Sequence, residues 1–396
     1  MIKAVIAASA LVVAAPALAE THTIAPGEGA QERLQEALIL AKPGDVIALE
    51  AGRYSLTDGL SLFVDGVTVQ GAGMDKSVLD FSDQQGSGEG LLVTSDGVTL
   101  RDFAVENAKG DGIKSKGADQ IIYDRLRVEW TNGPDANNGA YGIYPVEARD
   151  IVVQDSYVRG ASDAGIYVGQ SEKIIVRRNR VVENVAGIEI ENSNRAEVTE
   201  NLATLNTGGI LVFDLPGLPK VGGGDVLVAR NAVIDNNTDN FAPEGNIVAS
   251  VPAGTGVMVM ANTGVVLSDN MLVNNKTSQI MLIAYNQPYE DERYQPRPVN
   301  VQVKDNIYGS GGTQPDFPGG DLLAAALGGA LPPVLTDGLH QGLHLEDSIP
   351  ALSLGLTQVG QPLSQASPVP WTPAELEPFP QLRAVQLPAS MAARLN

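Results

Sequence analysis

The chain has no cysteine and only three histidines among its 396 residues, and aromatic residues make up 5% of it. Without cysteine it has no disulfide bond, no thiolate metal site and no N-terminal cysteine for a lipid anchor. Two of the histidines, His340 and His344, are four residues apart, but Gly342 interrupts the helix that a zinc-binding pair would use. The third is His22. The sequence therefore predicts no cofactor and no metal site built from cysteine or histidine.

Positive charge is also scarce, because 26 Lys and Arg stand against 47 Asp and Glu, which gives a formal net charge of −21. Phosphate binding needs a basic surface, so we expect no nucleic-acid partner. The overall negative field also disfavours a highly anionic polysaccharide, unless a local basic patch opposes it.

Long apolar runs are missing except at the start, where the sequence reads "MIKAVIAASALVVAAPALAE". One basic residue, an apolar stretch and Ala-x-Ala before Glu20 are typical of a cleaved secretory signal peptide. The run is too short and too rich in alanine for a good membrane span. We therefore expect residues 1–19 to be removed, no membrane span in the mature chain, and a periplasmic or secreted protein that is not a lipoprotein.

Glycine, in contrast, is abundant at 43 residues, and it marks a repeat. Strands of the form Gly-Ile-x-Val begin at Gly142, Gly165, Gly187 and Gly209, 22 or 23 residues apart, and similar strands lie on both sides. A second column in the same phase consists of Asp155, Asn179, Asn201, Asn231, Asn270 and Asn306. A unit of about 22 residues cannot bury its own apolar face, whereas stacked units, about 4.8 Å apart, bury a continuous core. The repeat predicts an all-β, right-handed parallel β-helix with an internal asparagine ladder.

Both ends of such a solenoid need a cap. Residues 30–45, "AQERLQEALILAKPGD", carry apolar residues at helical spacing before Pro-Gly, which predicts an N-terminal capping helix. The repeat is not recognisable after residue 308. We expect a β-helix domain over residues 20–308 and, over residues 309–396, an irregular tail rich in Pro, Gly and Leu that packs on the solenoid.

Side chains alternate along a strand, so the outward positions of the Gly-Ile strands follow from the sequence. Two residues after each glycine position, the column includes Lys114, Tyr144, Tyr167, Glu189, Leu211, Met258 and Met281. Two residues further on it includes Lys116, Val146, Gly169, Glu191, Phe213 and Met260. The apolar third of this face needs a cover or a partner. We expect the tail to cover it, with the insertions of the repeat as the alternative.

Four insertions adjoin the same strands, at residues 131–141, 214–225, 237–255 and 286–300. Long insertions often carry function. We expect them to wall both edges of the sheet and to form a groove over its outer face. The alternative is that they are tolerated surface loops.

Glu189 and Glu191 are two residues apart on one face, which places their Cα atoms about 6.5–7 Å apart. That separation is within reach of the carboxyl spacing of inverting glycoside hydrolases, roughly 6.5–9.5 Å. With Asp163 at the turn before Tyr167 as an extra acid, they form the predicted catalytic set. The alternative is a solvated pair on the outside of the solenoid.

Tyrosines beside this pair offer flat faces on which a sugar could stack. The predicted substrate-binding residues are Tyr141, Tyr144, Tyr167, Lys114, Lys116, Glu147, Gln170, Asn192 and Asp214. The last four form a column at the strand ends, suited to sugar hydroxyls or Ca²⁺, or to an inward structural ladder. The two lysines would serve as the base of an elimination only if burial lowered their proton affinity.

Over residues 24–308 the sequence resembles the pectin-lyase-like superfamily, through "PGDVIALEAGRYSL" and "GVTVQGAG". The stretches "NGAYGIYPV", "GASDAGIYVGQS", "VAGIEIENS" and "GGILVFDLPGLP" look like a family of periplasmic β-helix repeat proteins of unassigned activity, which tends to be encoded beside a cytochrome-type partner. The repeat style is also similar to the β-helix accessory protein of nitrous-oxide reductase maturation.

The superfamily resemblance implies polysaccharide lyases, hydrolases and epimerases with sites on an outer sheet face. The chain lacks the Asp-Pro-His-Asp motif of mannuronan epimerases and the histidine of polygalacturonases, and shows no clear calcium-aspartate and arginine set of pectate lyases. Three hypotheses remain open. The protein binds or processes a glycan or polysaccharide at the tyrosines and glutamates; or it is a non-catalytic accessory of a periplasmic redox protein, docking through the apolar row; or it is a purely structural surface protein.

Overall fold

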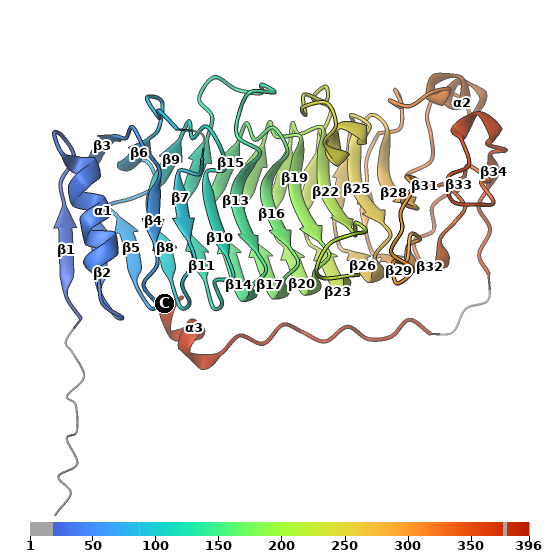
Figure 1. Ribbon diagram of the computed structural model, residues 1–396. Helices are drawn as coiled ribbons and strands as arrows, with labels where there is room; N and C mark the ends of the chain where they lie inside the picture. The colour runs from blue at the N-terminus through green and yellow to red at the C-terminus, as the bar shows by residue number, and fades with distance from the viewer. Residues whose placement is uncertain (1–18, 87, 375–377, 396) are drawn as a thin grey trace, which may run out of the picture.

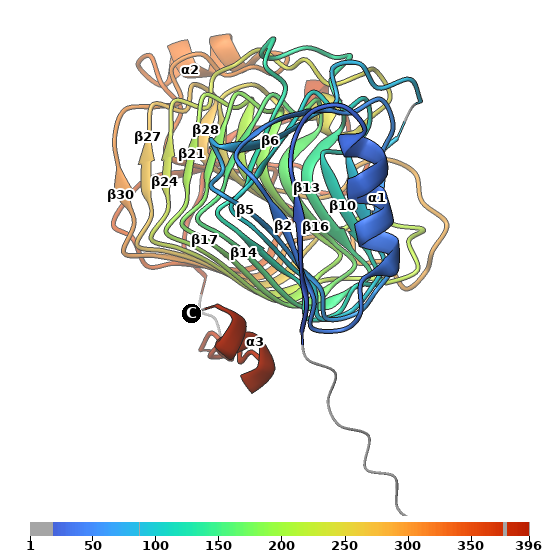
Figure 2. The ribbon, with the colours of Figure 1, turned by 90° about the vertical axis from the view of Figure 1, so that its left-hand side faces the viewer.

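The computed structural model describes residues 19–86, 88–374 and 378–395, so all but the last residue of the expected signal peptide lie outside the described residues. Three parallel sheets wind around one axis and enclose a continuous apolar core (Figures 1 and 2). The parallel β-helix that the repeat predicts is therefore confirmed. Among the described residues, no helix is long and apolar enough to cross a membrane.

Each sheet takes one strand from successive coils of the solenoid. Sheet A contains β1 (Thr21–Ile24), β2 (Val46–Leu49), β5 (Thr68–Gly71), β8 (Thr99–Arg101), β11 (Ile122–Asp124), β14 (Arg149–Gln154), β17 (Glu172–Arg177), β20 (Asn194–Thr199), β23 (Gly224–Ala229), β26 (Thr263–Ser268), β29 (Val299–Lys304) and β32 (Gln341–Leu345). Sheet B contains β3 (Gly52–Ser55), β6 (Ser77–Asp80), β9 (Ala104–Glu106), β12 (Arg127–Glu129), β15 (Tyr157–Arg159), β18 (Arg180–Val182), β21 (Leu202–Thr204), β24 (Ala232–Ile234), β27 (Met271–Val273) and β30 (Ile307–Tyr308).

Sheet C is the sheet of the Gly-Ile strands. It contains β4 (Leu60–Leu62), β7 (Leu91–Val93), β10 (Ile113–Lys116), β13 (Tyr141–Val146), β16 (Ala164–Gly169), β19 (Ala186–Glu191), β22 (Gly208–Phe213), β25 (Thr255–Met260), β28 (Ser278–Ile283), β31 (Val334–Thr336), β33 (Ala351–Ser353) and the antiparallel β34 (Val369–Pro370). The helices are α1 (Ala30–Leu40), α2 (Gly320–Ala326) and α3 (Ala389–Arg394), with 3₁₀ turns η1 (Ile247–Ser250) and η2 (Leu363–Gln365).

The register of sheet C places equivalent positions of successive coils side by side. Tyr167 pairs with Glu189, Glu189 with Leu211, and Leu211 with Met258. The isoleucines between these positions face the core and are fully buried. The outward column predicted from the sequence is confirmed, because the strands stay in register from coil to coil and every second side chain of a strand lies on the same face.

The asparagine ladder is confirmed from Asn179 onward. The side-chain amides of Asn179, Asn201, Asn231 and Asn270 each donate to the side-chain oxygen of the next asparagine at 3.0 Å, and that of Asn306 donates to Asp347 at 3.1 Å. Asp155 was wrongly placed in this column. Val153, not Val152, pairs with Val176, so the ladder position of that coil is Ser156, whose N–H donates to Asn179.

A second ladder was not predicted. It runs through Asn184, Asn206, Asn236 and Asn275, with amide-to-oxygen distances of 2.9–3.1 Å. Each member follows a member of the first ladder by five residues, so the sequence did contain the signal. Both ladders satisfy buried polar groups at the turns and lock neighbouring coils in register.

Helix α1 is the predicted N-terminal cap, and it ends at Leu40, shortly before the expected stop at Pro43-Gly44. Leu34 and Leu38 are buried and close the first end of the core. At the other end, the expected loss of the repeat after residue 308 is wrong. Strands β31, β32 and β33 pair in parallel with sheets C and A and continue the solenoid, before β34 pairs antiparallel with β33.

Residues 378–395 return along the outside of sheet A (Figure 1). Together with strands β31, β32 and β33, this shows that the expected single irregular tail after residue 308 is wrong. Met391 of α3 is fully buried against Ile122, Val152 and Ile175. The Arg394 guanidinium donates to the backbone oxygens of residues 97, 98 and 120. Segment 378–395 thus ties the last residues to coils near the start of the solenoid.

Candidate functional site

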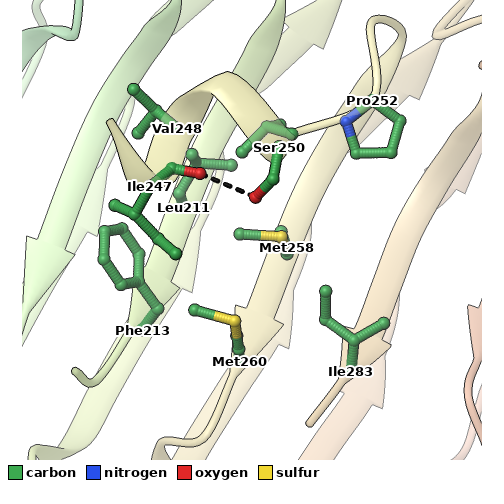
Figure 3. Close-up of a pocket in the computed structure, with 10 residues that line it drawn as sticks. Leu211, Phe213, Ile247, Val248, Ser250, Pro252, Met258, Met260 and Ile283 are labelled. Atoms are coloured by element: carbon green, nitrogen blue, oxygen red, sulfur yellow. Dashed lines mark hydrogen bonds between the residues drawn. The ribbon is translucent and has the colours of Figure 1, made fainter. Parts of the chain in front are cut away.

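The apolar third of the outer face of sheet C is covered by the chain itself. Insertion 237–255, with η1, lies over Leu211, Phe213, Met258 and Met260 (Figure 3). The expectation that the tail covers this row is therefore wrong for most of its length. Tail residues, among them Leu339, Leu354 and Leu356, pack on the last part of the row, near Met281.

The two glutamates that precede this row in sheet C are buried as well. Glu189 is 1% exposed and Glu191 is 6% exposed, so the alternative of a solvated pair is wrong. Asp163, 5% exposed, lies close enough to Glu189 for their charges to interact. We call Asp163, Glu189 and Glu191 the acid cluster.

Three tyrosines, Tyr141, Tyr144 and Tyr167, lie beside the acid cluster, and we call them the tyrosine cluster. Their ring centroids are 4.5, 4.7 and 4.9 Å apart, in tilted and edge-to-face arrangements. Tyr167 is buried, whereas Tyr141 and Tyr144 remain partly exposed. Aromatic rings at such separations attract one another beyond the effect of burial, so the cluster forms a coherent surface.

Gly169 makes room for the Tyr167 ring. A Cβ atom at residue 169 would lie 2.2 Å from the Tyr167 hydroxyl oxygen. The ring therefore lies over the glycine, and its hydroxyl donates to Glu191, which faces Gly169 across the strand pair. Glycine is needed at this outward position because any side chain there would collide with the Tyr167 ring.

Burial changes the protonation of the acid cluster. It raises the pKa of Glu191 to about 7, although the hydrogen bond from Tyr167 opposes the shift. Burial, and then the charges of Asp163 and Glu191, hold the pKa of Glu189 well above its ordinary range. Burial also raises the pKa of Asp163, against hydrogen bonds with Tyr141 and Asn246. One carboxyl oxygen of Glu189, Oε1, has no hydrogen-bond partner among the described residues. At least part of this cluster therefore carries protons near neutral pH.

The lysines of the face are paired. Lys114 Nζ lies 3.0 Å from Glu89 and 3.2 Å from Asp111, and 4.9 Å from the centroid of the Tyr144 ring. Burial by itself would lower the pKa of Lys114, but the bonds and charges of these two carboxylates outweigh it and raise the pKa. Lys114 is therefore unsuited to be the base of an elimination.

The column at the strand ends divides into an open and a closed part. Glu147 is exposed and pairs with Lys116 at 3.4 Å, and Gln170 is partly exposed. Asn192 and Asp214 are buried, and their side chains hold insertion 214–225 through bonds with the backbone of residues 215, 220 and 223. Burial raises the pKa of Asp214 to about 7. These two are positioned as structural groups, which corrects their expected contact with a ligand.

A calcium site receives no support from this column. Among residues 19–86, 88–374 and 378–395, no group of three or more Asp, Glu or His is arranged to hold a metal ion.

Sequence reasoning missed three members of the site. Asn246 donates to Asp163 at 3.2 Å across 83 residues of sequence, and no periodicity marks it. Glu89 and Asp111 were missed although each stands directly before the glycine of its strand. An acidic residue at the same position of two neighbouring coils was the sequence signal that could have identified them.

The comparisons with known proteins agree with this architecture. Residues 64–219 match the family model described as a right-handed β-helix region. The protein is a right-handed parallel β-helix. Among curated proteins, no sequence matches this β-helix protein.

Solved structures match it along most of its length. The A-module of mannuronan C-5 epimerase AlgE4 from Azotobacter vinelandii is 17% identical, with a TM-score of 0.55, over 80% of this β-helix protein and 90% of the module. The AlgE6 A-module from the same organism is 18% identical, with a TM-score of 0.55, over 81% and 92%. An alginate lyase from Paenibacillus sp. str. FPU-7 is 19% identical, with a TM-score of 0.47, over 74% and 97%. At these identities the likeness to the two epimerase modules shows the fold alone.

Proposed function

We propose that this protein binds a neutral carbohydrate chain on the open part of the outer face of sheet C, with the tyrosine cluster as the stacking surface. The observation that carries the proposal is the packing of Tyr141, Tyr144 and Tyr167 within 4.5–4.9 Å of one another, two of them partly exposed. Aromatic rings with polar tips suit a ligand that is apolar on its ring faces and hydroxylated at its edges.

The open surface extends from the tyrosine cluster toward the N-terminal end of the solenoid. Phe63, an outward residue of the first coil of sheet C, is 59% exposed. Phe63 directly follows β4 and Tyr144 lies on β13, with β7 and β10 between them, so three strand spacings, about 14 Å, separate the two residues. That span suits several residues of an extended chain rather than one small molecule.

The charges of this surface favour an uncharged ligand. Lys114 is paired with Glu89 and Asp111, and Lys116 with Glu147, so acidic groups outnumber the basic ones. The chain as a whole carries a formal charge of −21. A polyanion would have to overcome this field. In this respect the proposed ligand differs from mannuronan, which the epimerase neighbours are named for.

The acid cluster behind the tyrosines provides a route from binding to processing. A carboxyl group with a pKa of about 7, such as Glu191, carries its proton in about half of the molecules at neutral pH and could deliver it to a leaving oxygen. Both solved epimerase neighbours carry names of carbohydrate-modifying enzymes, which supports a carbohydrate ligand without assigning a reaction.

The proposal can be tested by measuring binding to a panel of neutral and uronic-acid oligosaccharides. We expect neutral chains to bind, and Tyr144→Ala to weaken binding at least tenfold. Tyr157→Ala is the matched control, because Tyr157 is a partly exposed tyrosine of sheet B that stacks with Arg180. If no neutral chain bound, or if both variants weakened binding equally, the proposal would be wrong. For a chain that binds, Glu191→Gln distinguishes processing from binding, because it should abolish turnover and leave affinity within about threefold.

The redox-accessory alternative depended on an exposed apolar row. Met258, 3% exposed, lies beneath insertion 237–255, so the surface on which that alternative relied is not available in this structure.

A further inference from the structure

An apolar pocket lies beyond the acid cluster on the same face of the solenoid. Its floor is formed by outward side chains of sheet C, including Met260, Met281 and Leu335. Its walls come from segments outside the regular coils: Ile247 of insertion 237–255, and Phe317 and Leu354 of the C-terminal region. The pocket has a volume of about 370 Å³, which is within the range of small-molecule sites.

Figure 3 shows the smaller adjoining hollow, with part of the insertion and, from the floor of the pocket, Met260. Met260 and Ile283 point into the space beneath η1, and Ser250 bonds back to the Ile247 carbonyl oxygen at 2.7 Å. The two hollows share these residues, so the pocket continues beneath the insertion. Methionine side chains adapt their shape to what they contact, and Met260 and Met281 both lie here.

Water in this hollow finds few hydrogen-bond partners, because the floor and walls offer mainly apolar carbon. The acidic groups at the walls are already used. Asp316 accepts from the Ala253 N–H at 2.9 Å, and Asp337 from the Ala284 and Leu339 N–H groups at 2.6 and 2.8 Å. A hollow left empty would also forfeit the dispersion contacts of its lining.

The charges around the pocket restrict its ligand. None of the described residues that line it is Lys, Arg or His, whereas two are aspartates. Arg297 acts on Asp337 through its charge but does not line the pocket. The rim carries uncharged polar side chains, among them Ser250, Asn286 and Gln361. An anion would meet carboxylates without a counter-charge, while an uncharged polar end could bond to the rim.

We propose that this pocket binds a neutral, largely apolar small molecule with one uncharged polar end. The site is separate from the tyrosine cluster and does not depend on carbohydrate binding there. It also gives insertion 237–255 two roles, since Asn246 holds Asp163 while η1 roofs the apolar hollow.

The experiment compares two dyes that differ by one charge. N-phenyl-1-naphthylamine is neutral, and 8-anilinonaphthalene-1-sulfonate adds a sulfonate to the same framework. We expect the neutral dye to bind the full-length protein with saturable fluorescence at one equivalent, and the sulfonate to bind at least tenfold more weakly. Absence of saturable binding, or equal affinity for both dyes, would overturn the proposal.

Two variants locate the dye. Ser250→Trp should fill the mouth and lower the affinity for the neutral dye at least tenfold, whereas Ala249→Trp should not, because Ala249 is an exposed neighbour outside the lining. Should Ser250→Trp alter the circular dichroism spectrum, Leu363→Asp serves instead, since Leu363 is 39% exposed at the same rim. An affinity unchanged in the folded variant would show that the dye binds elsewhere and would refute the assignment.

Discussion

The outer face of sheet C contains two regions with the same backbone and opposite chemistry. In one, Tyr167 and Glu189 occupy successive coils, and in the other Leu211 and Met258 occupy the same position of the next two. All four side chains are buried. Burial of the leucine and methionine is favourable, whereas burial of the glutamate has a cost that its raised pKa records. This unfavourable burial is the physical feature that distinguishes the acidic region from the apolar one.

The largest effect is expected when a carboxyl group is placed in the apolar region, where nothing compensates its burial. Leu211→Glu puts a carboxyl beneath insertion 237–255 with no cation nearby among the residues that line the hollow there. We expect the free energy of unfolding to fall by about 3 kcal/mol or more at pH 8. The loss should be smaller at pH 5, where the carboxyl can stay protonated.

Urea denaturation followed by circular dichroism measures this loss. Leu205→Glu is the control, since Leu205 is 44% exposed at a turn, and it should shift the midpoint little. Equal shifts for the two variants would show that the cover over Leu211 does not exclude water.

The next largest effect is the pH dependence that comes from Glu191. Its pKa in the folded protein, about 7, lies above the ordinary value of 4.5. Between these values the folded state keeps a proton that the unfolded chain has released. The contribution of Glu191 to the free energy of unfolding is therefore fully present below pH 4.5. It falls by about 1.4 kcal/mol per pH unit as the pH rises toward 7.

Glu191→Gln should remove this part of the slope and raise the unfolding midpoint at pH 8, which urea titrations from pH 4.5 to 8 would reveal. Glu244→Gln, which changes an exposed glutamate of insertion 237–255, should keep the wild-type slope. A Glu191→Gln slope equal to that of the wild type would contradict the buried position of this carboxyl.

The smallest effect sharpens the comparison at the tyrosine cluster. Gly169→Ala brings a methyl group against the Tyr167 ring and forces the ring to move. We expect a loss of about 1–2 kcal/mol in stability. The pKa of Glu191 should fall, because the gain of water, which removes the larger effect, outweighs the weakened hydrogen bond from Tyr167, and NMR titration would measure this. Ser61→Ala, on the same face of sheet C, is the control. Gly117→Ala would not serve, because Gly117 has a left-handed backbone conformation that alanine disfavours. An unchanged Glu191 titration would show that the Tyr167 ring does not shield it.

Much of this molecule follows from its periodicity. Because Tyr167, Glu189 and Leu211 follow one another at intervals of 22 residues, the repeat predicts which side chains are neighbours, which face outward and where asparagines stack. One error in the repeat, at Asp155, arose where coil lengths change and a one-residue shift passes unnoticed. The tyrosines and glutamates of the candidate site could be named in advance for the same reason.

Only the tertiary structure decided whether those glutamates are exposed to solvent or buried. Burial depends on what lies above a side chain, and here the cover includes residues 237–255, which have no period and are held by contacts such as Asn246 with Asp163, 83 residues apart. The return of segment 378–395 along sheet A is a long-range contact of the same kind, since Met391 meets Ile122 across most of the chain. The spacing of a repeat predicts which residues of neighbouring coils pair, whereas the position of an aperiodic segment depends on the surface on which it packs.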